Sequence, residues 1–141
     1  MAKDFDCPQG GVLRVSENHF EIDRSSHIRT SAVNKEFYNL IVDEKKLFAA
    51  KHQLYTFAIM VAVFHEADPD ISTKSEDICL VGNVNTDNLA IAKGIVSQLC
   101  PDIKGGSDLL KRMTEYADAG IGILRVEYEN NGRLRLDNYI E

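Results

Sequence analysis

The segment His65-Glu66-Ala67-Asp68 groups a histidine with carboxylates, as metal sites and acid–base catalytic sites do. It lacks the second histidine, one helical turn away, that turns such a segment into a zinc motif. A solvated helix end before Pro69 explains the segment better, so we expect no metal ion here. The remaining histidines stand at no ligand spacing to it: His19, His27 and His52.

Two glycine-containing segments have some of the features of an anion-binding loop. Gly82 precedes a helical pattern, but one glycine is not a dinucleotide fingerprint, and Asp87 at the helix start would repel a phosphate. In residues 103–110, Lys104, two glycines and the free amides after Ser107 resemble an anion cradle. Its lysine precedes the glycines and no strand leads into it, unlike a Walker A loop. We interpret it as an interhelical turn and expect no cofactor.

No nucleophile in the sequence has a recognisable base. The triplet Ser25-Ser26-His27 lacks a nucleophile elbow, and Cys100-Pro101 lacks the pattern of a zinc deaminase. Catalytic triads assemble from distant positions, so single segments do not decide the question. Because no pattern points to catalysis, we expect no catalytic residues and a protein that is not an enzyme.

Composition favours one soluble domain. A chain of 141 residues, 44% hydrophobic and 27% charged, is long enough to bury a core. The net charge of −6 is spread evenly and no segment is basic, which argues against binding driven by a large positive field. The cysteines are odd in number and form no CxxC pair, as in a reducing cytoplasm: Cys7, Cys79 and Cys100.

The N-terminus has no apolar run of the signal-peptide type, and the longest apolar run, residues 54–64, is too short to cross a bilayer. We therefore expect a cytoplasmic protein with no membrane partner. Residues 1–11 contain one proline and two glycines and are predicted to be a flexible arm. Residues 12–141 are predicted to form a single mainly helical domain.

Periodicity predicts the elements of the first half. Residues 12–23 alternate between apolar and polar, which predicts a hairpin. Ser31 is a candidate N-cap for a helix, and residues 43–66 predict a second helix that is apolar on every side and therefore surrounded by neighbours. Residues 78–81 are interpreted as a strand or as the end of a helix.

The second half predicts two helices and a hairpin. Asp87 is expected to cap a helix over 88–99, and Ser107 one over 107–119, with Gly120 in the left-handed position that ends or bends it. In the tail, a three-residue loop at 130–132 gives one apolar face and one face of matched ion pairs. We therefore predict a C-terminal hairpin with Gly132 left-handed in a bulge.

The predicted fold class is a mainly helical α+β domain, compact, with short β-hairpins near both ends and a winged-helix-like C-terminal half. In a winged helix, the second helix of the pair enters the DNA major groove. Acids share that helix here, and an acid faces each hairpin arginine, so the surface favours protein contact over DNA. The candidate contacts for DNA or a partner are cationic: Lys104, Lys111, Arg112, Arg125, Arg133 and Arg135.

Three segments, "LFAAKHQLYTFAIMVAVFHEAD", "DNLAIAKGI" and "EYADAGIGIL", resemble in order the small protein family associated with bacterial and archaeal DNA phosphorothioation (Dnd) gene clusters. The resemblance covers about residues 47–124. Its most specific part is Glu115-Tyr116-Ala117 followed by Gly120 and Leu124. Asp118 stands where the family often has asparagine, and neither hairpin belongs to the family pattern.

The resemblance implies a non-catalytic accessory role in defence or DNA modification, and it supplies no catalytic residue. We therefore expect an adaptor with a protein partner or a homo-oligomeric state. The contact would use the exposed side of helix 107–119, the C-terminal hairpin and the loop at 68–87. The alternative is a winged-helix DNA-binding or regulatory protein.

Overall fold

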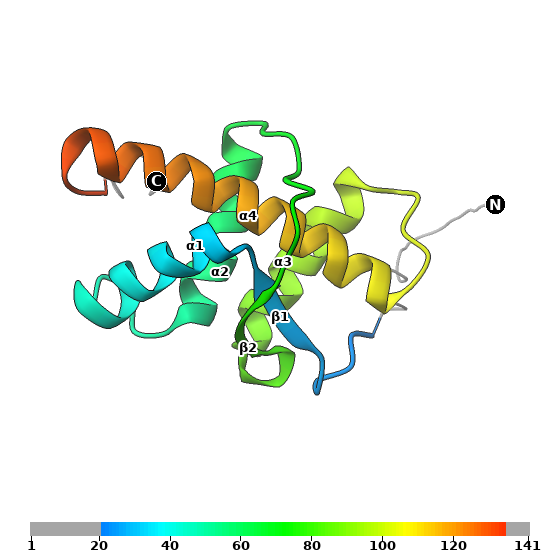
Figure 1. The fold of residues 1–141 in the computed structure, drawn as a ribbon. Coiled ribbons are helices and arrows are strands. Elements are labelled where there is room, and N and C mark those ends of the chain that lie inside the picture. The colour runs from blue at the N-terminus through cyan, green and yellow to red at the C-terminus, as the bar shows by residue number, and fades with distance from the viewer. Residues whose placement is uncertain (1–20, 135–141) are drawn as a thin grey trace.

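The computed structural model describes residues 21–134, and these form a mainly helical α+β fold, which confirms the predicted class (Figure 1). The predicted arm at 1–11 lies outside the described residues, as does most of the hairpin predicted at 12–23. The elements, in chain order, are β1 (His27–Thr30), α1 (Ala32–Tyr38), the π-helical turn η2 (Asn39–Glu44), α2 (Lys51–Phe64), β2 (Glu76–Leu80), the 3-10 turn η3 (Val81–Asn83), α3 (Thr86–Leu99) and α4 (Gly106–Asn131).

The crossing of α2 and α4 forms the centre of the molecule. Figure 1 shows α4 running from yellow to red across α2. The two backbones meet at Gly120, where an added Cβ would lie 1.8 Å from the carbonyl oxygen of Ala58. Only glycine permits so close an approach at this position. The close crossing of α2 and α4 therefore requires glycine at position 120, where a hydrogen atom takes the place of a side chain.

The prediction that the helix around residues 54–64 is surrounded by neighbours is confirmed for most of the helix but not at Met60 and Phe64, which are 43% and 62% exposed. Leu54, Tyr55, Ala58 and Ile59 are fully buried. The helix begins at Lys51, later than the predicted residue 43, because the chain first completes η2 and then turns through Lys46, which has a φ of 55°. No helix within residues 21–134 is both long enough and apolar enough to span a bilayer.

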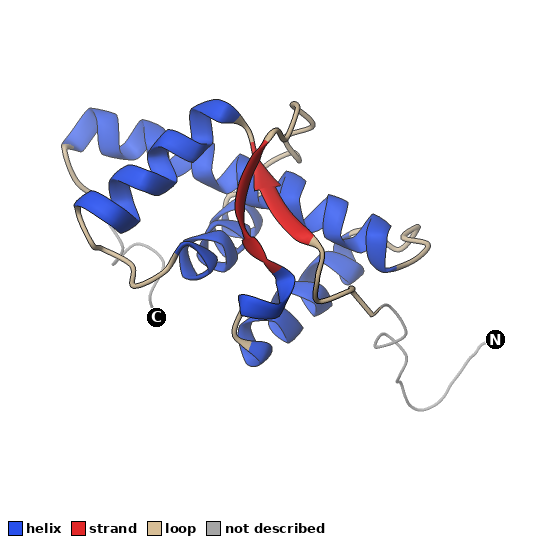
Figure 2. Ribbon diagram, turned by 60° about the horizontal axis from the view of Figure 1, so that its bottom comes forward, coloured by secondary structure: helices blue, strands red, loops and turns tan. Residues whose placement is uncertain are grey.

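The two strands form a small antiparallel sheet beside the helices (Figure 2). His27 pairs with Leu80 and Thr30 with Glu76, with an irregularity in register between Ile28 and Arg29. The strand β2 confirms one of the two interpretations of residues 78–81. No sequence pattern indicated β1, whose four residues are too few to show a clear alternation.

The predicted C-terminal hairpin is wrong, because α4 continues through Val126 and Tyr128 to Asn131. Buried or half-buried apolar side chains continue at helical spacing beyond the predicted end at residue 119, and Tyr128 packs its ring edge-on against Phe37 at 6.1 Å. These positions give the helix a continuous buried face: Met113, Ala117, Ile121, Leu124 and Tyr128. The residues expected to form the first strand of the wing are part of α4 instead. The predicted winged-helix-like C-terminal half is therefore also wrong.

Glycine conformations account for the misplaced helix end. Among the described glycines only Gly132 has a positive φ, 72°, and its N–H donates to the Tyr128 carbonyl at 2.7 Å. The left-handed conformation predicted for Gly132 is therefore confirmed, but it ends a helix instead of forming a bulge. The prediction that Gly120 is left-handed is wrong, because Gly120 lies inside α4.

Of the N-caps predicted at Ser31, Asp87 and Ser107, one is confirmed. The Ser31 side chain accepts from the Asn34 N–H at the start of α1. The cap of α3 is Asn85, whose Oδ1 accepts from the Asp87 N–H at 3.0 Å, so Asp87 lies in the first turn. Ser107 lies inside the first turn of α4, which no side chain caps.

Candidate functional site

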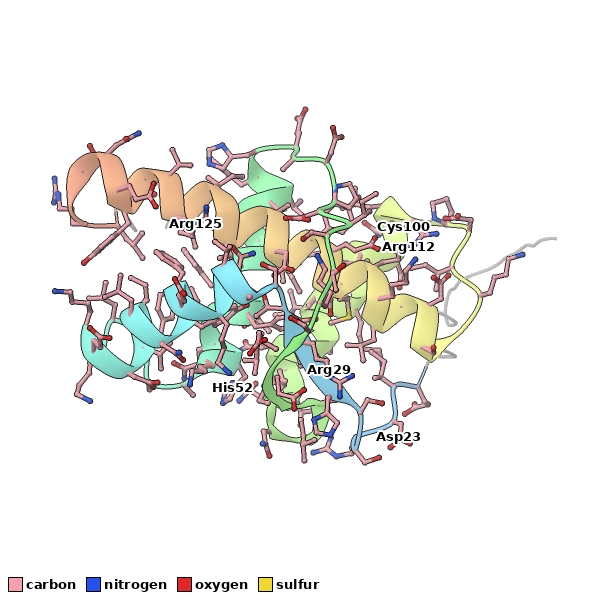
Figure 3. The ribbon with its side chains drawn as sticks, viewed as in Figure 1. Asp23, Arg29, His52, Cys100, Arg112 and Arg125 are labelled. Atoms are coloured by element: carbon pink, nitrogen blue, oxygen red, sulfur yellow. The ribbon has the colours of Figure 1, made fainter. Side chains whose placement is uncertain are left out.

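Two of the cations predicted as DNA or partner contacts, Lys111 and Arg112, lie on α4 and are paired with acids. Figure 3 shows Arg112 and Arg125 well apart on that helix. Lys111 Nζ lies 3.7 Å from Glu115, and Arg112 Nη2 lies 3.1 Å from Asp102. The hydrogen bond from Arg112 holds the pKa of Asp102 below its ordinary value. These pairs leave little positive charge for a phosphate backbone.

The other cations predicted as contacts form no common surface with Lys111 and Arg112. Arg125 donates from Nη1 to Asn34 Oδ1 at 2.8 Å, which connects α4 to α1. Lys104 is exposed in the turn before α4, and Arg133 is exposed just after it. Arg135 lies outside the described residues. The structure therefore does not bring this set together into one basic surface within residues 21–134.

The His65-Glu66-Ala67-Asp68 segment ends α2 at the molecular surface. The His65 ring packs edge-on against Phe64, with 5.2 Å between the ring centres. Within residues 21–134, no group of three or more histidine, cysteine, aspartate or glutamate side chains is arranged to hold a metal ion.

A buried polar cluster surrounds Asp118, whose side chain is 1% exposed. Thr30 Oγ1 donates a hydrogen bond to Asp118 Oδ1, and Lys74 Nζ lies 2.8 Å from Oδ2. Asn34 Nδ2 donates to the Asp118 backbone carbonyl at 3.4 Å. A buried carboxylate requires such compensation, because burial of an unpaired charge is costly. The cluster joins β1, α1 and the loop after α2 to α4.

Two buried tyrosines lie beside this cluster. The Tyr55 hydroxyl hydrogen-bonds to Thr114 Oγ1 at 3.2 Å, whereas the Tyr38 hydroxyl has no hydrogen-bond partner among the described residues. Burial raises the pKa of both phenols, and the negative charge of Asp118 raises the pKa of Tyr38 further. Both hydroxyls therefore stay protonated at neutral pH.

The segment that carries the most specific part of the family resemblance has a structural role here. The Glu115 carbonyl accepts from the Asp70 N–H at 2.9 Å, and Gly120 permits the approach to Ala58. Asp118, between them, anchors Lys74 and Thr30. Residues 115–120 are thus the part of α4 on which a strand, a helix and a loop converge.

A pocket of about 340 Å³ lies between β1 and the N-terminal half of α4. Three cations line it, and each is close to an acid. Arg29 Nε lies 2.7 Å from Asp77, while Lys74 and Lys111 contact the acids described above. The positive charge of this pocket is therefore largely compensated by its neighbours.

A second depression, which we call the α2–α3 groove, has a volume of about 420 Å³. No charged side chain lines it. Met60 is 43% exposed and Ile91 is 54% exposed, although both are apolar. Its apolar walls come from α2, α3 and the segment before α2: Phe48, Phe57, Met60, Ile91 and Ala92. The sequence did not reveal this groove, because α2 is apolar on all sides and its pattern does not show which side is left uncovered.

A third depression, which we call the α4 groove, has a volume of about 490 Å³ and lies between the end of the 65–70 loop and α4. Asp68 and Asp70 line one side. The α4 side is apolar and consists of Ala119, Gly122, Ile123 and Val126. Of the predicted contact regions, the loop at 68–87 contributes Asp68 and Asp70 to this groove, and helix 107–119 contributes Ala119.

Because no family model matches the chain, its resemblance to the phosphorothioation-associated family stays a prediction. Comparison of the chain with protein-family models, with curated proteins and with solved structures gives no match.

Proposed function

We propose that this protein is a non-catalytic adaptor that binds an amphipathic helix of a partner protein in the α2–α3 groove. The observation that supports this most directly is an uncharged depression with exposed apolar walls, in which Met60 and Ile91 face solvent. Exposed apolar patches of this kind mark protein-interaction sites on soluble domains.

The shape of the groove suits a helix. It is lined from Gln53 to Met60 on α2 and from Asn88 to Ala92 on α3, so at the usual rise per residue its walls extend about 10 Å and about 6 Å, enough for about two turns of a partner helix. Partner helices bind such grooves through apolar side chains spaced three and four residues apart. The Phe48 and Phe57 rings, 5.4 Å apart, form an aromatic surface at one end.

The chemistry of the lining favours neutral side chains on the partner. Its polar members are Gln53, Thr56 and Asn88, which can hydrogen-bond but carry no charge. A charged side chain entering the groove would lose water without gaining an opposite charge. The groove-facing stripe of the partner is therefore apolar, with neutral polar residues at its edges.

The resemblance in sequence supplies the setting that we propose for this partner, which is a subunit of a prokaryotic defence or DNA-modification complex. The rival winged-helix reading receives no support from α4, which contains the residues expected to form the first strand of the wing, and in which Lys111 and Arg112 contact acids. We therefore propose no second function.

The test uses Ile91→Glu, which places a charge in the groove. Val33→Glu is the matched control, because Val33 on α1 is 57% exposed and lies outside the groove. The tagged full chain is purified from its native host together with the proteins that bind it. The partner is then produced separately, and titration measures its affinity for the wild type and for each variant. We expect Ile91→Glu to weaken binding by at least about tenfold and Val33→Glu by less than about twofold.

Equal affinity of Ile91→Glu and wild type would contradict the proposal, as would recovery of the chain alone as a monomer. Self-association that Ile91→Glu abolishes would show instead that a second copy fills the groove. Retarded migration of duplex DNA at low salt, lost when Lys111 and Arg112 become alanine, would favour the DNA-binding alternative.

A further inference from the structure

The α4 groove is separate from the α2–α3 groove, because the two share no lining residue. Gly120 faces Ala58 where α2 and α4 touch. Gly122 is rotated by about 200° from Gly120 around the helix, so it faces away from that contact. The molecule therefore presents two separate depressions.

The apolar wall of the α4 groove has the spacing of one helix face. Ala119, Gly122, Ile123 and Val126 follow one another at intervals of three, one and three residues. Val126 is 54% exposed, so the fold leaves it largely uncovered. No heavy atom lies within 4 Å of the position that a Cβ on Gly122 would occupy. The wall thus has an open notch in which another chain can approach the α4 backbone closely.

The facing wall carries negative charge. Asp68 is exposed and forms no ion pair within residues 21–134. Asp70 remains ionised at neutral pH: burial raises its pKa, but hydrogen bonds from Ser72 and the nearby Lys74 lower it by more, so the pKa is below its ordinary value. Glu129 lies three residues beyond Val126 and extends the acidic rim along α4.

Of the cations near this groove, Lys74 is shared between Asp70 and the buried Asp118, and Arg125 is bound elsewhere. Lys74 Nζ lies 2.8 Å from the buried Asp118, and 3.6 Å from Asp70 Oδ1. Arg125, adjacent to Val126 in sequence, donates instead to Asn34 on α1 (Figure 3). No lysine or arginine lines the groove itself. The acids therefore give the rim a negative charge.

We propose that the α4 groove binds a cationic amphipathic segment of a partner protein, with an apolar side chain over the Gly122 notch and lysine or arginine beside Asp68 and Asp70. Charge complementarity selects this occupant, because an acidic rim attracts cations and repels nucleic acid and acidic surfaces. This site shares no residue with the α2–α3 groove, so the adaptor would have two separate docking surfaces.

The test uses three helical peptides with the same leucine face, flanked by lysine, by glutamine or by glutamate. Each is titrated into the isotopically labelled full chain and followed by amide NMR shifts. We expect the lysine-flanked peptide to shift the amides of residues 67–70 and 119–126, and the other two to leave them in place. Added salt should weaken the binding, because the attraction is partly between exposed charges.

Gly122→Leu fills the notch, and Gly94→Leu is its matched control. Gly94 is an exposed glycine inside α3, also with no heavy atom near its Cβ position, and it lines none of the three depressions described above. Because both sites are open, both variants should keep the helical circular dichroism of the wild type. We expect Gly122→Leu to lower the affinity for the lysine-flanked peptide by about tenfold, and Gly94→Leu by less than about twofold.

Three outcomes would overturn the inference: no shifts at 67–70 and 119–126 with the lysine-flanked peptide, equal shifts with the glutamate-flanked peptide, or unchanged affinity in Gly122→Leu. Ile91→Glu separates this site from the proposed function. If the inference holds, that variant binds the lysine-flanked peptide as the wild type does, whether or not the partner of the α2–α3 groove is lost.

Discussion

Tyr38 and Tyr55 are both fully buried, but only Tyr55 has a hydrogen-bond partner for its hydroxyl among the described residues. An unpaired buried hydroxyl costs desolvation energy without compensation. We expect Tyr38→Phe to raise the free energy of unfolding by up to about 1 kcal/mol, and Tyr55→Phe to lower it by about 1 kcal/mol. Urea unfolding of both variants measures the difference.

The stabilities of the two variants can be compared directly, because each variant removes one hydroxyl group from a buried tyrosine. A loss of stability in Tyr38→Phe equal to that in Tyr55→Phe would show that the Tyr38 hydroxyl has a partner in solution.

Also at the scale of single residues, the partners of the buried Asp118 could not be predicted from the sequence. Thr30 and Asp118 are 88 positions apart, and Lys74 lies in a loop that carries no motif. One signal was present: Asp118 is three residues before Ile121 and four after Thr114, so it shares their buried helical face. A charged residue on a buried face indicates a partner, but periodicity does not identify it.

At the scale of elements, the crossing of α2 and α4 depends on Gly120. An added Cβ there would lie 1.8 Å from the Ala58 carbonyl oxygen, so the helices would have to separate. We expect Gly120→Ala to lower the free energy of unfolding by about 1–3 kcal/mol. The added methyl group would overpack the contact between α2 and α4, and this cost is larger than the gain from the better helix propensity of alanine. Thermal unfolding measures this loss.

Gly94→Ala is the control for Gly120→Ala, since Gly94 is open to solvent inside α3. There only helix propensity changes, and we expect a gain of about 0.5–1 kcal/mol. Equal shifts in the unfolding temperature of the two variants would contradict the close packing at Gly120.

Element boundaries were predicted well where local chemistry decides them and poorly where packing does. Ser31 caps α1 through its own side chain, which the sequence shows directly. Around residues 124–128, both a strand and a helix place apolar residues on one face. Leu124 is fully buried and Tyr128 packs against Phe37 on α1, so tertiary contacts select the helix.

At the scale of the whole molecule, stability should fall in alkaline solution. Burial raises the pKa of Cys79 to about 11 and also raises the pKa of Tyr38 and Tyr55. In the unfolded chain these groups titrate near their ordinary values, about 8.5 for cysteine and about 10 for tyrosine. Above each ordinary value the unfolded chain releases its proton first, so rising pH favours unfolding.

We therefore expect the unfolding temperature to be level just below pH 8.5 and to fall as pH rises towards 11. Cys79→Ala should reduce the slope between about pH 8.5 and 10, where the cysteine contributes alone among these groups. Circular dichroism melts across this range measure it. A slope that is the same in Cys79→Ala and wild type would contradict the contribution of Cys79.

At the same scale, composition and periodicity predicted the class of the fold and the buried position of α2. They did not predict either groove. Met60, Ile91 and Val126 have the same apolar character as residues of the core, and only the arrangement of the helices decides which of them stay uncovered. The candidate surfaces therefore required the structure.

The loop after α2 is fastened to α4 at two points, by the Asp70 N–H to the Glu115 carbonyl and by Lys74 to Asp118. Its acidic wall is thus in position before any partner arrives. A segment that is already ordered has little conformational entropy left to lose on binding. A peptide in the α4 groove would therefore meet a preorganised surface, and most of the ordering cost would fall on the peptide.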